Sequence, residues 1–279
     1  MARGAMIPCL TIAGSDSSGG AGIQADLKTF AAHGVYGMSV ITAVTAQNTL
    51  GVSAIHPVPA DIVHQQLEAV LSDIPPAAIK IGMLGEVDTV KAIASDLAAY
   101  KGSVANLSIV LDPVMISSSG HRLISDDTLK VLLEDLIPLA DIITPNTAEL
   151  KALLGWFDLE FDEITTQAQL EKATIALLEK LRGKNKLPPA ILSKGGHLKG
   201  DAADLLLNQN DSHWLISQRI NNPNTHGTGC TLSSAITANL AKKQPLKTAV
   251  EEAKNYLTQA ISQQLDLGNG IGPLNHIKN

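Results

Sequence analysis

Apolar residues along the chain alternate between short continuous runs and longer stretches with helical spacing. The short runs are bounded by Gly, Asp and Ser, and such runs predict buried strands: they are residues 10–13, 39–46, 78–82, 108–112, 141–144 and 190–193. The longer stretches repeat apolar positions every three or four residues, which predicts helices: they are residues 23–33, 60–72, 87–100, 126–136, 168–182, 231–242 and 246–264. Another helix begins at 145–146, and residues 204–207 and 214–217 predict a hairpin.

Strands that alternate with helices indicate an α/β fold. Because the strands are continuously apolar, both faces of the sheet must be covered, which predicts a three-layer α/β/α domain around a mostly parallel sheet. Right-handed crossovers bring the strand carboxyl ends to one edge, where ligands bind in such sheets. Small, polar and glycine-rich segments fall at that edge: 14–22, 45–49, 82–85, 112–120, 144–149, 193–200 and 225–231.

No break in composition divides the chain, so we expect a single domain over residues 1–279, with 1–6 as a loose leader. The chain is 45% hydrophobic and 17% charged, with no apolar run long enough to span a membrane and no secretory signal. Its two cysteines, Cys9 and Cys230, make a disulfide framework improbable and favour a reducing cytoplasm. A net charge of −6 and 3% aromatic residues argue against a nucleic-acid partner.

The run 226–235, His-Gly-Thr-Gly-Cys-Thr-Leu-Ser-Ser-Ala, leads from small residues directly into a predicted helix. Gly227 and Gly229 remove side-chain bulk where the chain must turn. The N–H groups at such a junction lack partners and point outward at the positive end of the helix dipole, where they can hold a phosphate. The alternative is a glycine turn before a packing helix. We identify Gly227, Thr228, Gly229 and Cys230 as candidate catalytic residues.

Two acids and a lysine also fall at this edge. Asp112 ends a strand, Glu149 opens the helix after another strand, and Lys194 precedes two glycines. Mg²⁺ is held by few carboxylates together with waters and phosphates, so Asp112 and Glu149 are candidate metal ligands. Glu149 has an alternative role as a capping carboxylate, because Asn146 lies three residues earlier. Lys194 is a candidate nucleotide contact, or else a solvated lysine at a strand end.

Six segments in order resemble the hydroxymethylpyrimidine and phosphomethylpyrimidine kinases of the ribokinase-like superfamily. They are Ala13–Asp26 (AGSDSSGGAGIQAD), Thr45–Thr49 (TAQNT), Lys80–Leu84 (KIGML), Leu111–Met115 (LDPVM), Thr144–Glu149 (TPNTAE) and Gly227–Cys230 (GTGC). Each is weak alone, but together they span nearly the whole chain. The resemblance implies a ribokinase-like fold and a thiamin-pathway enzyme that uses Mg²⁺ and ATP. Its substrates would be 4-amino-5-hydroxymethyl-2-methylpyrimidine and then the monophosphate.

The resemblance also assigns a substrate site. It implies that the Gln47 amide pairs with the aminopyrimidine edge, since an amide offers the complementary acceptor and donor. Without the resemblance, Gln47 would be interpreted as an ordinary residue of a strand-end turn. Asp26, in the first turn of its predicted helix, would lie near the hydroxymethyl group, or else would only favour the helix N-terminus. Met83 would form an apolar wall against the ring, or belong to the core, and Gly14 would line the same site.

The implied nucleotide contacts are Asn146, Lys194, Thr228 and, on a polar helix face, Lys254. Cys230 is either a thiolate base on the attacking hydroxyl or a small polar residue beside the anion hole. Residues 116–121 would form a flap over the substrate. The other readings are a pyridoxal kinase of the same superfamily and a non-catalytic nucleotide-binding protein on this scaffold. Many relatives are dimers, so a homodimer is expected.

Overall fold

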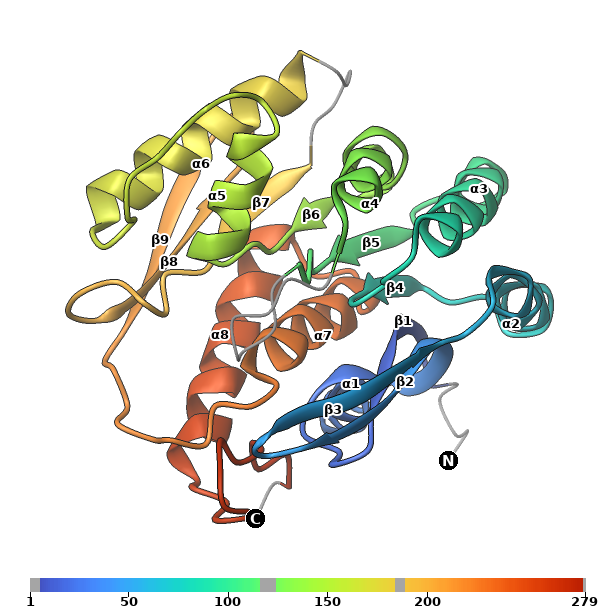
Figure 1. Cartoon of the computed structure of the whole chain (residues 1–279), viewed down its shortest axis with the longest axis horizontal. Helices are drawn as coiled ribbons and strands as arrows, with labels where there is room; N and C mark the ends of the chain where they lie inside the picture. The colour runs from blue at the N-terminus through green and yellow to red at the C-terminus, as the bar shows by residue number, and fades with distance from the viewer. Residues whose placement is uncertain (1–5, 116–123, 184–188, 278–279) are drawn as a thin grey trace.

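A computed structural model describes residues 6–115, 124–183 and 189–277, in which nine strands form one sheet (Figure 1). The predicted flap at 116–121 and residues 1–5 of the predicted leader lie outside the described residues. The strands are β1 (Pro8–Asp16), β2 (Tyr36–Asn48), β3 (Gly51–Pro57), β4 (Ala78–Ile81), β5 (Ser108–Leu111), β6 (Ile142–Ile143), β7 (Ala190–Ser193), β8 (Ala202–Leu207) and β9 (Ser212–Ser217). Their order in the sheet is β3-β2-β1-β4-β5-β6-β7-β8-β9.

The sheet is mostly parallel, as the sequence predicts. The six strands from β2 to β7 in the sheet order pair in parallel. Strand β3 is antiparallel to β2, and β8 is antiparallel to both β7 and β9. The sequence pattern missed β3 because nearly all its residues are exposed and it carries no apolar run. The predicted hairpin at 204–207 and 214–217 is confirmed as β8 and β9.

Helices cover both faces of this sheet, which confirms the three-layer α/β/α arrangement (Figure 1). Helices α1, α7 and α8 pack on one face, and helices α2 to α6 pack on the other. They are α1 (Gly22–Ala32), α2 (Ala60–Asp73), α3 (Val87–Ser103), α4 (Asp126–Val131), α5 (Thr147–Gly155), α6 (Gln167–Arg182), α7 (Thr228–Ala241) and α8 (Leu246–Ser262).

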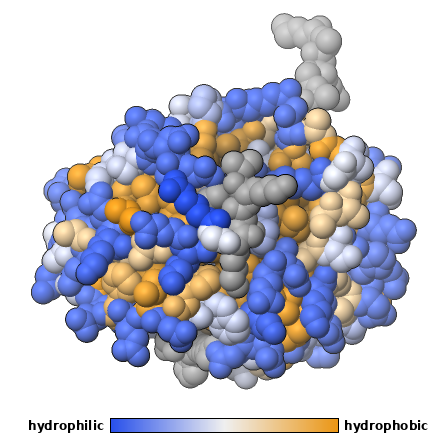
Figure 2. Space-filling view, turned by 90° about the horizontal axis from the view of Figure 1, so that it is seen from above, coloured by the Kyte–Doolittle hydropathy of each residue, from blue (hydrophilic) through white to orange (hydrophobic). Residues whose placement is uncertain are grey.

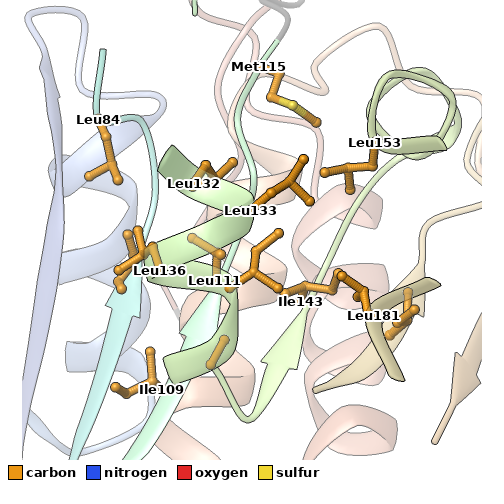
Figure 3. Close-up of a cluster of buried hydrophobic side chains, with 14 of the residues drawn as sticks. Leu84, Ile109, Leu111, Met115, Leu132, Leu133, Leu136, Ile143, Leu153 and Leu181 are labelled. Carbon is orange, nitrogen blue, oxygen red and sulfur yellow. The ribbon is translucent and has the colours of Figure 1, made fainter. Parts of the chain in front are cut away.

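The larger core lies on the face that helices α2 to α6 cover. Figure 3 shows Leu133 and Leu136 over Leu111 of β5 and Ile143 of β6. The helix predicted over 126–136 ends as α4 at Val131, and a wider π-helical turn carries Leu132–Leu136. Three leucines of that turn are buried, so core packing overrides the regular α-helical spacing there.

The carboxyl ends of the parallel strands meet at one edge of the sheet. Strand β1 lies between β2 and β4, so the chain reverses its direction across the sheet at β1, the position at which α/β sheets bind ligands. Helix α7 contacts β1, β4 and β5 and begins at this edge. Figure 2 shows one face of the molecule, on which hydrophobic surface lies in patches between hydrophilic residues. None of the described helices is long and apolar enough to cross a membrane.

Candidate active site

The glycine turn places the first residues of α7 at this edge. Gly227 caps the helix with a φ of 81°, and a Cβ there would lie 1.9 Å from the carbonyl oxygen of Gly20. Both facts require glycine. Helix α7 begins at Thr228, three residues before the predicted start. In the described chain the N–H groups of Gly229 and Cys230 donate to no backbone carbonyl, and both residues are half-buried. Unpaired N–H groups at a helix N-terminus can bind an anion, and the predicted anion site at this turn stays a prediction.

An ion pair between Asp112 and Lys194 faces this turn. The Lys194 ammonium lies 2.8 Å from Asp112 Oδ1, which also accepts from the Thr144 hydroxyl at 3.0 Å. A Cβ on Gly229 would lie 3.3 Å from both Asp112 Oδ2 and Lys194 Nζ. The structure therefore brings three predicted site residues together, with Gly229 in the first turn of α7 against a largely buried pair of opposite charges.

Glu149 has the capping role that the sequence offered as an alternative. Its carboxylate accepts from the Asn146 N–H at 2.8 Å, while the Asn146 side chain accepts from the Glu149 N–H at 2.9 Å. Glu149 Oε2 also lies 3.8 Å from Lys194 Nζ. Burial raises the pKa of Glu149 to about 7 although the Lys194 charge lowers it, and the neighbouring charge of Asp112 raises it further.

Asp112 keeps its charge. Burial alone would raise the pKa of Asp112, but the charges of Lys194 and Lys80 more than offset this, and the pKa lies below its usual value. No group of three or more His, Cys, Asp or Glu side chains suited to a metal occurs in the described parts of the chain. Two carboxylates are what Mg²⁺ uses when phosphates and waters supply its other ligands. Asp112 and Glu149 therefore fit a phosphate-bound Mg²⁺ and do not form a closed protein cage.

Beneath the turn, Cys230 lies close to the buried ion pair of Lys80 and Asp26. Burial raises the pKa of the Cys230 thiol to about 11, although the Lys80 charge lowers it. The charges of Asp26 and Asp112 raise it further, and a hydrogen bond from the Gly22 N–H lowers it. Cys230 is therefore a neutral thiol in the free protein at neutral pH. Its predicted role as a general base stays a prediction.

Asp26 lies below the site and is fully buried. Its Oδ2 accepts from Lys80 Nζ at 2.8 Å and from the Thr11 hydroxyl at 2.6 Å, and its Oδ1 accepts from the Ser234 hydroxyl at 2.7 Å. The predicted first-turn position is wrong, because α1 begins at Gly22 and Asp26 lies in its second turn. Both oxygens are occupied by protein groups, and its predicted contact with a substrate stays a prediction.

The remaining predicted substrate residues form the side of the site next to β1 and β2. A Cβ on Gly14 would lie 2.4 Å from Met83 Cε, so the missing side chain makes room for Met83. Gln47 lies in β2, not in a turn, and its side-chain Nε2 is 3.2 Å from His226 Nε2. His226 Nε2 lies 2.8 Å from Asp16 Oδ2. Gln47 is thereby linked to the residue that precedes Gly227.

Lys254 lies on α8 and reaches the loop that follows Lys194 through Asp204. Its ammonium pairs with Asp204 Oδ2 at 2.5 Å, and Asp204 Oδ1 accepts from the Gly195 N–H at 2.8 Å. Lys254 therefore supports the loop that follows Lys194. Direct contact between Lys254 and a nucleotide stays a prediction.

Comparison with known proteins identifies the family. A profile of phosphomethylpyrimidine kinases matches residues 16–275. The chain belongs to the phosphomethylpyrimidine kinase family. It is 48% identical over 272 residues to a hydroxymethylpyrimidine/phosphomethylpyrimidine kinase of Haemophilus influenzae, covering 96% of this chain and 95% of that protein.

Solved structures agree with this family assignment. The chain is 44% identical to a phosphomethylpyrimidine kinase of Clostridium difficile 630, covering 91% of this chain and 99% of that one, with a TM-score of 0.75. It is also 32% identical to the pyridoxal kinase of Staphylococcus aureus in complex with AMP-PCP and pyridoxal, covering 98% and 94% with a TM-score of 0.84. The ribokinase-like fold is confirmed.

In this member of the phosphomethylpyrimidine kinase family, no sequence pattern predicts a role for Lys80, Asp16 or His226. Lys80 stood in one of the six motifs, and a lysine inside the otherwise apolar strand Ala78–Ile81 signals a buried charge that needs a partner. The partner, Asp26, lies 54 positions away on another element. No comparable signal marks the approach of His226 to Asp16, because it depends on how the end of β1 meets the distant segment before α7.

The buried ion pair predicts a large loss of stability for Lys80→Met. This substitution leaves the Asp26 carboxylate buried without its cation, which costs about 3–5 kcal/mol. Urea denaturation measures the change in the free energy of unfolding. The matched control is Lys101→Met, because the Lys101 pair with Asp141 is partly exposed, and such pairs contribute less than about 1 kcal/mol. Equal losses in the two variants would contradict a special role for the buried pair.

The raised pKa of Cys230 predicts slow alkylation that accelerates with pH. Only the thiolate reacts, and with a pKa of about 11 its fraction rises about tenfold for each pH unit up to pH 10. Iodoacetamide labelling between pH 7 and 9.5, with the fold checked by circular dichroism, measures this slope. A Cys230→Ala variant reports the background from Cys9, whose pKa burial raises to about 12. A plateau below pH 9 would show that the thiol is already ionised.

Proposed function

We propose that this chain transfers a phosphoryl group from ATP to the hydroxymethyl oxygen of 4-amino-5-hydroxymethyl-2-methylpyrimidine, and then phosphorylates the monophosphate. These are steps of thiamin biosynthesis. One observation carries the proposal beside the family: α7 begins at Thr228 with the N–H groups of Gly229 and Cys230 unpaired to backbone carbonyls, and Gly229 lies against the Asp112 and Lys194 pair. Phosphoryl transfer needs this combination of positioning and charge neutralisation more than covalent chemistry.

The roles of the site residues follow from their surroundings. The N–H groups of Gly229 and Cys230 stabilise negative charge on the transferring phosphoryl group, and Lys194 adds a positive charge beside them. Asp112 and Glu149 hold Mg²⁺, which neutralises phosphate charge when it is bound. Cys230 can act as the base on the attacking hydroxyl only after it has lost its own proton, and the Lys80 ammonium lowers the cost of forming that thiolate. Thr228 and Asn146 flank the nucleotide phosphates.

The substrate binds between the carboxyl ends of β1 and β2 and the start of α7. Gln47 pairs with the aminopyrimidine edge, Met83 packs against the ring, and Gly14 leaves space for Met83. Lys254 acts on the nucleotide side through Asp204 and the Gly195 loop. Asp26 holds Lys80 below the hydroxymethyl group. A homodimer and a cytoplasmic location remain further expectations of the proposal.

Pyridoxal phosphorylation is a second candidate activity, because the pyridoxal kinase of Staphylococcus aureus has the same fold over almost the whole chain. Coupled ATP turnover with the pyrimidine alcohol, its monophosphate and pyridoxal decides between the two. We expect turnover with both pyrimidines and less with pyridoxal. Turnover with pyridoxal alone would replace the proposal by the second candidate, and turnover with none would favour a non-catalytic nucleotide-binding protein.

Gly229→Val should abolish most of this activity. A valine places carbon against Asp112 Oδ2 and Lys194 Nζ, where even a Cβ has only 3.3 Å, and it excludes a phosphoryl group. We expect kcat to fall by roughly 10²–10³-fold, as when a transition-state hydrogen-bond donor is lost. Gly102→Val is the matched control, because a Cβ at Gly102 meets no atom within 4 Å. Normal turnover by Gly229→Val would remove the α7 turn from the mechanism.

Gln47→Leu should weaken pyrimidine binding and leave nucleotide binding unchanged. The leucine offers no partner to the amino group and ring nitrogen, and an unpaired buried polar group costs ~1–3 kcal/mol. Affinity for the pyrimidine should therefore fall roughly 10- to 100-fold. Calorimetric titration of each ligand measures the two affinities separately. Equal losses for the pyrimidine and for ATP would mean that Gln47 supports the fold instead of the substrate.

A further inference from the structure

His226 Nε2 contacts two polar groups at once. It lies 2.8 Å from Asp16 Oδ2 and 3.2 Å from the end of the Gln47 side-chain amide. His226 is buried, with 8% of its surface exposed, so water does not mediate these contacts. A ring nitrogen carries either one hydrogen or one lone pair, and this limits which atoms can face it. The protons of this network can therefore be assigned.

Asp16 fixes the proton on His226. The Asp16 carboxylate accepts hydrogen bonds from the N–H groups of Ser18, Gly20 and Ala21. Burial alone would raise the pKa of Asp16, but the hydrogen bonds from His226, Ser18 and Ala21 lower it to about 2. Asp16 is therefore a charged acceptor at neutral pH. His226 Nε2 must carry a hydrogen toward it, and has no lone pair left to accept one from Gln47.

The Gln47 amide then has one consistent orientation. The amide atom that faces His226 must be the oxygen, which shares the Nε2 hydrogen with Asp16. The NH₂ group then faces Thr45 Oγ1, which lies 3.2 Å from the other end of the amide. The Thr45 hydroxyl donates to the Ser15 carbonyl oxygen at 2.9 Å, so its oxygen is free to accept from Gln47. If the amide nitrogen of Gln47 faced His226 instead, its N–H and the Nε2–H of His226 would point at each other.

We propose that His226 is a positioning residue for substrate specificity, because its Nε2 hydrogen, directed by Asp16, fixes which end of the Gln47 amide accepts and which end donates. The inference rests on the proposed function. Gln47 then selects a ring edge on which an amino donor adjoins a ring-nitrogen acceptor in one order. A ligand with the reversed order pairs only after turning over, which moves its hydroxymethyl group away from α7.

The imidazole ring is held so that it can perform this role. The backbone N–H of His226 donates to the Gly272 carbonyl oxygen at 3.1 Å and so fixes the residue from which the ring extends. On the ring's other side, a Cβ at Gly20 would lie 2.4 Å from His226 Cδ2 and 3.2 Å from Pro273 Cβ. The ring is therefore confined between Gly20, in the loop after β1, and Pro273 in the C-terminal segment. Its position does not depend on Gln47, so it can determine the orientation of that amide.

The 4-oxo analogue of the pyrimidine alcohol tests the proposal, because its carbonyl and ring N–H reverse the donor and acceptor. The wild-type protein should prefer the 4-amino substrate by roughly 100-fold in kcat/KM, since the analogue leaves two buried groups unpaired. In His226→Phe the Gln47 amide can turn, and the preference should fall below about tenfold. The KM for ATP should stay unchanged. The matched control is His213→Phe, at a pair with Glu251 between β9 and α8, and it should keep the full preference.

A full preference in an active His226→Phe would overturn the inference. If that variant does not fold, nuclear Overhauser contacts in the wild-type protein decide. Contacts from the Gln47 NH₂ protons to Thr45 support the assigned orientation, and contacts to the His226 ring overturn it. Failure of the proposed function has a different signature, because the wild-type protein would then phosphorylate neither pyrimidine. The network would lose its proposed meaning in that case even with the amide oriented as assigned.

Discussion

The buried ion pair of Lys80 and Asp26 fixes how the elements of the site meet. Neither side chain is exposed, so neither charge can be left without the other. Asp26 also accepts from Thr11 of β1 and Ser234 of α7, and thus four elements (β1, β4, α1 and α7) share one carboxylate. A buried pair contributes little net stability compared with apolar packing. Its consequence here is geometric, because any shift of α7 along the sheet would separate charges that have no access to water.

The charged side chains of the site, this pair included, do not cancel. Asp26, Asp112 and Glu149 carry three potential negative charges, against two positive charges on Lys80 and Lys194. The imbalance and the burial act together, and they raise the pKa values of Glu149 and Cys230. Protonation of Glu149 would restore neutrality, whereas a bound divalent cation would change the net charge of these groups from −1 to +1, which favours a phosphate. The site is thus prepared for a phosphate group that arrives with its cation.

The sequence predicted most of the fold because hydrophobic spacing determines it locally. The strand Ala78–Ile81 and helix Gln167–Arg182 are marked by apolar positions that any sheet or helix would bury. It missed the exposed strand Gly51–Pro57, whose pairing with β2 depends on backbone hydrogen bonds that leave no apolar pattern. The helix predicted over 126–136 is α-helical only as far as Val131 for a related reason, since tertiary packing selected a π-helical turn for Leu132–Leu136.

The residues of the site show the same difference between features that local sequence predicts and features that depend on distant partners. Asp112 and Lys194 could be placed at one edge because each follows a parallel strand, and the topology brings strand ends together. The burial of Asp26 and the pairing of Lys254 with Asp204 could not be predicted, because both depend on partners far away in the sequence. A carboxylate in a helix looks the same in a sequence whether it faces a ligand or, as at Asp26, a buried lysine.

The neutral thiol of Cys230 is electrostatically coupled both to the buried Lys80 and Asp26 pair and to Asp112. Its pKa is raised by burial first and then by Asp26 and Asp112, while Lys80 opposes them. Asp112 is also the carboxylate closest to Lys194 and a proposed metal ligand. A cation bound at Asp112 would cancel one of the charges that disfavour the thiolate, and would thereby lower the pKa of Cys230. Binding of the cation and activation of the thiol are therefore electrostatically coupled through Asp112, without any movement of the backbone.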